Sequence, residues 1–69
     1  MTKREMIKAI QVAEARAWKQ LQDDKKLFGE TSAITDITRN KWNPLFELRE
    51  ALGIPGLGVS DLIREDLLP

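Results

Sequence analysis

KKLFGETSAI, residues 25–34, decides the fold because it ends one predicted helix and begins the next within a few residues. Its two lysines lie where the helix dipole favours cations, and Gly29 suits the position just beyond a helix C-terminus. Thr31 or Ser32 can then cap the following helix. Because so short a turn makes its flanking helices antiparallel neighbours, we predict a helical hairpin with its turn at residues 29–31.

The segment before the turn is predicted to form one long helix, from about residue 3 to residue 28. Thr2 and Glu5 have the spacing of a capping box. Apolar side chains recur with the helical period and fall within an arc of roughly 140°, which is typical of a helix that faces a core. These side chains are Met6, Ile7, Ile10, Ala13, Ala17, Trp18, Leu21 and Phe28.

A second helix is predicted from about residue 32 to residue 52. Its apolar stripe, which we expect to face the first helix, consists of Ile34, Ile37, Leu45, Leu48 and Leu52. Lys41 occupies the missing step of this stripe, where its alkyl stem can lie along the interface while the ammonium group reaches water.

Pro44 lies inside this second helix and leaves two interpretations open. One helix could end at Trp42 and another begin with Asn43 as its N-cap and Pro44 in its first turn. Alternatively, one helix passes through the proline with a kink. The apolar stripe keeps its register across Pro44, which favours the single kinked helix.

The stretch ALGIPGLGVSD, residues 51–61, holds three of the four glycines. Gly53 follows a predicted helix rather than a strand, so it suits the left-handed residue of a Schellman motif and not a phosphate-binding loop, which needs a helix N-terminus. We expect a Gly/Pro turn over residues 53–59. A short helix then follows over about residues 61–68, with Ser60 as its N-cap.

The formal net charge is zero, yet the charges are unevenly distributed along the chain. Residues 1–26 carry seven basic and four acidic side chains, whereas residues 43–69 carry two basic and five acidic ones. In a hairpin the acidic tail would dock near Lys3, Arg4 and Lys8. We therefore expect one all-α domain over the whole chain, residues 1–69.

The composition argues against catalysis and against a cofactor. The chain has no histidine and no cysteine, so it lacks the usual general base and the usual metal ligands. Glu14 and Asp24 border the first apolar stripe, where Lys41 or Arg39 could neutralise them. We expect no catalytic, cofactor-binding or metal-binding residue, no small-molecule substrate, no membrane span or signal peptide, and a cytoplasmic location.

Trp42 and Phe46 lie four residues apart and off the main stripe of the second helix, so they form a second apolar face. We predict that this face, together with Trp18, is a partner interface, and that the leading partner is a second copy in a homodimeric four-helix bundle. The alternative is that the C-terminal segment covers Trp42 and Phe46. Either way, the predicted function is a non-catalytic protein–protein interaction or assembly module.

A basic stripe on the first helix supports a rival function, the binding of nucleic acid by a small regulatory protein. This stripe consists of Arg4, Lys8, Arg16, Lys19 and Lys26. Acidic residues interrupt the stripe, and no helix-turn-helix spacing or interleaved aromatic residue accompanies it.

The motifs AWKQL, LFGE, KWNPLFEL and ALGI together resemble a pattern found in short helical-hairpin proteins of phages and prophages of Gram-positive bacteria. The resemblance covers about residues 13–54. Pro44 departs from the continuous second helix that the pattern leads us to expect. The resemblance implies a cytoplasmic protein associated with a mobile element, and it supplies no activity and no functional residue.

Overall fold

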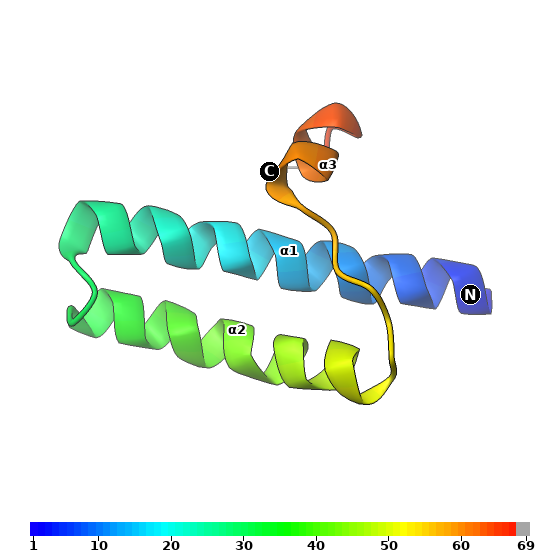
Figure 1. The fold of residues 1–69 in the computed structure, drawn as a ribbon, viewed down its shortest axis with the longest axis horizontal. Helices are drawn as coiled ribbons and strands as arrows, with labels where there is room; N and C mark the ends of the chain where they lie inside the picture. Colours follow the sequence, from blue (N-terminus) through cyan, green and yellow to red (C-terminus); the bar gives the residue numbers. More distant parts are fainter. Residues whose placement is uncertain (68–69) are drawn as a thin grey trace.

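The computed structural model describes residues 1–67, and these residues form three helices without a strand. The two long helices, α1 (Lys3–Phe28) and α2 (Ala33–Ala51), lie side by side and antiparallel (Figure 1). The short helix α3 (Val59–Arg64) lies on the far side of α1 from α2. The predicted all-α hairpin with a short C-terminal helix is therefore confirmed.

Helix α1 has the predicted boundaries because both of its ends are capped. The side chain of Thr2 accepts a hydrogen bond from the backbone N–H of Glu5, and the Glu5 carboxylate accepts one from the backbone of Thr2. At the other end, Gly29 has a φ of 91° and donates its N–H to the carbonyl of Lys25. A side chain would strain this backbone conformation, so glycine suits the position at which the helix stops.

Helix α2 continues through Pro44, so the interpretation with two separate helices is wrong. It begins after Ser32, whose hydroxyl accepts the N–H of Ile34. It ends in the predicted Schellman motif. Gly53, with a φ of 67°, donates to the carbonyl of Glu50, and the N–H of Ile54 reaches the carbonyl of Arg49.

The third helix differs from its prediction. It spans Val59–Arg64 rather than about residues 61–68, and the last of these positions lies outside the described residues. Its N-cap is Gly58 instead of Ser60, and the N–H of Gly58 donates to the carboxylate of Asp61 at 3.1 Å. The carboxylate of Asp61, one residue beyond the predicted cap, therefore stabilises the start of this helix.

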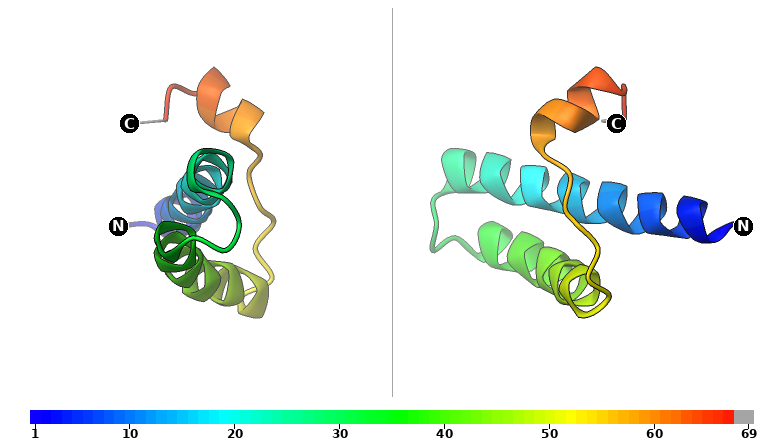
Figure 2. Two further views of the ribbon diagram at one scale, coloured as in Figure 1. Left: turned by 90° about the vertical axis from the view of Figure 1, so that its left-hand side faces the viewer. Right: turned by 45° about the vertical axis from the view of Figure 1, so that its right-hand side comes forward.

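The C-terminal segment docks on α1, and within residues 1–67 Lys8 is the one of the three predicted basic residues that forms an ion pair with it. Lys8 forms an ion pair with Glu65 at 2.9 Å, and the guanidinium of Arg16 donates to the carbonyl of Leu67. Leu62 of α3 is fully buried. The linker between α2 and α3 runs along one side of the hairpin, and on the opposite side the chain passes only above α1, after α3, which leaves α2 uncovered there (Figure 2). We call that opposite side the open side.

The face of α2 that packs on α1 is not the predicted one. Thr35 and Thr38 are buried in the interface, whereas the four outer members of the predicted stripe are exposed. Those exposed members are Ile34, Ile37, Leu48 and Leu52. The helix is therefore rotated so that its threonines, Trp42 and Arg49 meet α1, and its aliphatic stripe turns outward.

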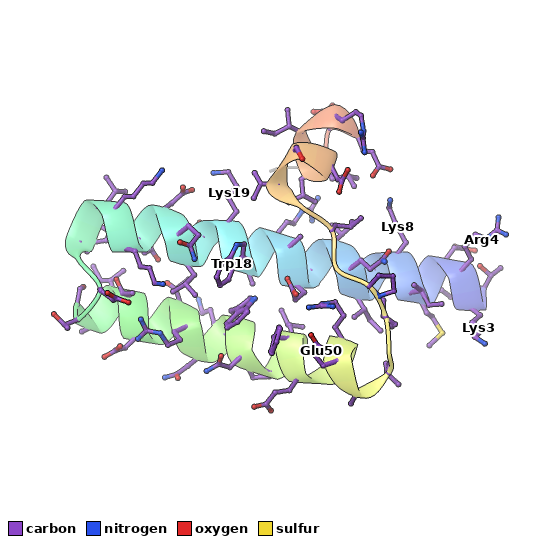
Figure 3. All side chains as sticks on the ribbon, viewed as in Figure 1. Lys3, Arg4, Lys8, Trp18, Lys19 and Glu50 are labelled. Carbon is purple, nitrogen blue, oxygen red and sulfur yellow. The ribbon has the colours of Figure 1, made fainter. Side chains whose placement is uncertain are left out.

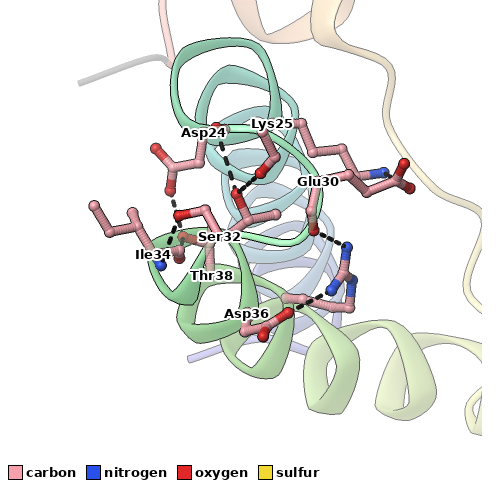
Figure 4. A network of polar contacts seen from close by, with 10 residues as sticks. Asp24, Lys25, Glu30, Ser32, Ile34, Asp36 and Thr38 are labelled. Atoms are coloured by element: carbon pink, nitrogen blue, oxygen red, sulfur yellow. Dashed lines mark hydrogen bonds and ion pairs between the residues drawn. The ribbon is translucent and has the colours of Figure 1, made fainter.

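Hydrogen bonds near the turn hold α2 in this rotation (Figure 4). The Thr38 hydroxyl donates to the carboxylate of Asp24, which also accepts the side-chain amide of Gln20 at 3.0 Å. The Thr35 hydroxyl donates to the carbonyl of Gly29 at 2.6 Å. Because buried polar groups need partners, these bonds keep both threonines on the inward face. Asp24 is thus paired with neither Lys41 nor Arg39, the two partners that the sequence had suggested.

Candidate interaction surface

The three aromatic residues predicted to bind a partner pack against one another between α1 and α2, and Trp18 stays 39% exposed. The ring of Trp42 lies with its centroid 4.9 Å from that of Trp18 and 4.9 Å from that of Phe46. Trp18 points from α1 toward α2 (Figure 3). The prediction that Trp42 and Phe46 form a face apart from the hairpin core is therefore wrong in its geometry.

The physical reason lies in the size of these rings. An aromatic side chain buries more apolar area than leucine or isoleucine, and tilted ring pairs add a further attraction. The linker also approaches this cluster, because Gly56 and Leu57 line the same cleft of about 340 Å³ as the two tryptophans. The C-terminal segment thus covers part of this face, as the alternative interpretation predicted. A partner role for the three aromatic residues stays a prediction.

A buried ion pair beside the aromatic cluster ties three parts of the chain together. The Arg49 guanidinium donates to the Glu14 carboxylate at 2.7 Å and to the carbonyl of Ile54 at 2.8 Å. The side chains of Arg49 and Glu14 are only 12% and 8% exposed. Arg49 also lies over the ring of Phe46, with 5.4 Å between its central carbon and the ring centroid. Glu14 is therefore paired with Arg49 and not with Lys41 or Arg39, the partners predicted from the sequence.

The surface that remains available to a partner is the aliphatic stripe of α2. We call Ile34, Ile37, Leu48 and Leu52 the α2 apolar face, and they are 44–57% exposed. At 100° per residue, they lie within about 60° of one another around the helix. Their shared side is the open side, because around α2 they lie on one side of the residues that meet α1, whereas Phe46, which lines the linker cleft, lies on the other.

Helix α1 adds smaller side chains to the open side. Ala9, Ala13, Gln20 and Leu27 are all exposed and fall within about 40° of one another around the helix. They lie on the side of α1 marked by Met6, which shares the apolar groove with Leu52. We call these four residues the α1 small face. The open side therefore presents two parallel rows, bulky aliphatic residues from α2 and mainly small residues from α1.

The basic stripe proposed for nucleic acid is largely engaged within the chain. Lys8 pairs with Glu65, Lys19 pairs with Asp23 at 2.6 Å, and Arg16 holds the carbonyl of Leu67. Lys8 and Lys19 point from α1 toward the side on which α3 lies (Figure 3). Of the five residues, only the exposed Arg4 and Lys26 make no hydrogen bond or ion pair within residues 1–67. Three of the five basic side chains that the stripe would offer to phosphates therefore already bind acceptors within the chain.

The described residues offer no cluster of three or more acidic side chains that could hold a metal ion. In residues 1–67, no helix combines the length and the apolar character needed to cross a membrane.

Comparison with known proteins adds no relative from which a function could be transferred. No family model, no curated protein and no solved structure matches the chain.

Proposed function

We propose that this protein is a non-catalytic interaction module that self-associates through the α2 apolar face. The observation that carries the proposal is the position of Ile34, Ile37, Leu48 and Leu52, which form an exposed aliphatic stripe, interrupted by Lys41, on one side of α2. Contiguous exposed apolar surface of this kind marks protein interaction sites in soluble proteins.

The small interior of the hairpin supports self-association. Among residues 1–67, only Ala15, Leu21, Ile54 and Leu62 are buried apolar side chains. A chain of 69 residues buries a modest fraction of its surface on folding, and small domains without disulfides or metals often gain stability from a second subunit. A partner on the open side would extend the core by the four residues of the α2 apolar face.

The composition supports a role without catalysis, because histidine and cysteine are absent from the sequence. The buried carboxylates of Glu14 and Asp24 stabilise the fold instead. Glu14 accepts a hydrogen bond from Arg49, and Asp24 accepts one from Thr38. A cytoplasmic location and an association with phages stay predictions of the sequence.

A single charge on the α2 apolar face tests the proposal. Burying the exposed half of Ile37 is worth about 1 kcal/mol, and a buried lysine adds a desolvation cost. We therefore expect Ile37→Lys to weaken a dimer by at least about a hundredfold, which corresponds to about 1.4 kcal/mol for each of its two copies. Sedimentation velocity over a range of concentrations measures the change.

Ile63→Lys is the matched control. Ile63 is 62% exposed, against 57% for Ile37, but it lies on α3 and not on α2. The control variant should associate like the unmodified chain. Equal dissociation constants for both variants would contradict the assignment of the interface to the α2 apolar face.

A further inference from the structure

We propose that the two copies are related by a two-fold axis parallel to the hairpin, so that the α2 apolar face of each copy packs on the α1 small face of the other. This inference rests on the proposed self-association and adds its geometry. It predicts an antiparallel four-helix bundle in which each helix has one neighbour from its own chain and one from the second copy.

The contacts within the hairpin show which residues of α1 and α2 lie at the same height, meaning the same position along the helix axis. Thr38 bonds to Asp24, Trp42 stacks on Trp18, and Arg49 pairs with Glu14. A two-fold axis parallel to the helices keeps equivalent residues of the two copies at the same height. Each residue of α2 therefore faces the same level of α1 in the second copy as in its own chain.

At these heights the two faces match in size. The residue numbers of the three contacting pairs sum to 62, 60 and 63, so Leu48 faces about residue 14 and lies close to the level of Ala13, while Leu52 lies close to the level of Ala9. Large side chains of one helix then meet small side chains of the other, which allows close approach and interdigitation. At the turn end, Ile34 meets the level of Leu27, a large side chain that is 73% exposed.

Lys41 favours the same arrangement. It is the charged residue within the stripe of α2, and it lies between the levels of Asp24 and Trp18, where Gln20 projects from the α1 small face. Gln20 donates its amide to Asp24, so its side-chain oxygen can accept a hydrogen bond from the Lys41 ammonium of the second copy. The polar residue of one face thus meets the polar residue of the other.

The other symmetric arrangement has its two-fold axis perpendicular to the hairpin and pairs α2 with α2. The midpoint of the α2 apolar face is residue 43, so the two copies of Lys41 would lie only about 6 Å apart along the helix axis. Like charges this close oppose association. This arrangement also places bulky aliphatic residues against one another on α2 and small residues against one another on α1, which leaves unequal helix spacings.

Disulfide trapping between single-cysteine variants tests the arrangement, because the chain has no cysteine of its own. Ala13→Cys and Leu48→Cys are prepared separately, mixed, and oxidised. One cysteine per chain excludes a crosslink within a monomer. The proposed arrangement predicts a covalent dimer in the mixture that contains both variants, in large excess over either variant alone. Such crosslinks form when the two Cα atoms approach to within about 7 Å.

Two further mixtures complete the test. Ala13→Cys with Ile37→Cys should give little crosslink, because Ile37 lies about 16 Å along the helix from Leu48 while being similarly exposed. Ile37→Cys with Leu48→Cys would crosslink preferentially if α2 packed on α2. That result would overturn the geometry and leave self-association intact.

Sedimentation of the reduced variants separates the two ways in which the inference could fail. A dimer without the Ala13–Leu48 crosslink places the interface elsewhere and contradicts the geometry alone. A monomer at every concentration, for the unmodified chain as well as the variants, contradicts both the geometry and the proposed function.

Discussion

The ion pair between Glu14 and Arg49 gives the sharpest prediction for stability. Its two side chains are 8% and 12% exposed, and 2.7 Å separates the donor nitrogen from the acceptor oxygen. Glu14→Gln keeps the size of the side chain and removes its charge. Arg49 then keeps the carbonyl of Ile54, at 2.8 Å, and a more distant contact with Glu50, at 3.4 Å.

Removing one partner of a buried ion pair typically costs about 3–5 kcal/mol, because the remaining charge is left uncompensated. The remaining contacts of Arg49 offset part of this cost, and a glutamine oxygen can still accept one hydrogen bond. We therefore expect Glu14→Gln to lower the free energy of unfolding by about 2–3 kcal/mol. That loss is a large share of the stability of so small a domain.

Urea unfolding followed by tryptophan fluorescence and circular dichroism measures the loss, with all chains at one concentration because association also stabilises the fold. Arg49→Met with Glu14→Gln completes a double-mutant cycle. We expect the double variant to lose less free energy of unfolding than the sum of the single variants, because neither charge is then left unpaired. A loss below about 0.5 kcal/mol for Glu14→Gln, the range of ordinary surface substitutions, would refute the assignment of a structural role to this pair.

Two further substitutions test how the linker and the turn are held. A Cβ atom at Gly56 would lie 3.2 Å from the guanidinium carbon of Arg49, so Gly56→Ala should lower the melting temperature. A Cβ atom at Gly58 would meet nothing nearer than 3.7 Å, so Gly58→Ala should lower the melting temperature less. Equal shifts would contradict a tight contact between Arg49 and the linker. Thr38→Val removes the hydroxyl that bonds to the buried Asp24 carboxylate, so we expect a loss of about 1–3 kcal/mol in urea unfolding, and an unchanged midpoint would contradict that role.

Local sequence signals predicted the helices well, because the features that end helices act over a few residues. The capping box at Thr2, the cap at Ser32 and the Schellman motif at Gly53 all involve partners within five residues of one another. The docking of the acidic tail on α1 also followed from the sequence, because an antiparallel hairpin brings the N-terminal part of α1 close to the C-terminal segment that follows α2.

The rotation of α2 could not be predicted from the same signals. Its two candidate faces are both apolar, one aliphatic and one aromatic, and periodicity alone does not rank them. The choice depends on contacts between residues far apart in the sequence. Arg49 reaches Glu14 across 35 positions, and Thr38 reaches Asp24 across 14. The aromatic side also carries Thr35, Thr38 and Arg49. Thr38 and Arg49 bond to carboxylates of α1, and Thr35 bonds to the turn at Gly29.

Self-association through the open side is the central claim, and sedimentation equilibrium of the unmodified chain tests it most directly. The measurement covers a wide range of concentrations at two salt concentrations, because an apolar interface should resist salt that screens charges. We predict that the apparent mass rises from 7.9 kDa for the monomer to twice that value. A mass that stays at 7.9 kDa throughout would contradict the claim and leave the α2 apolar face without its proposed partner.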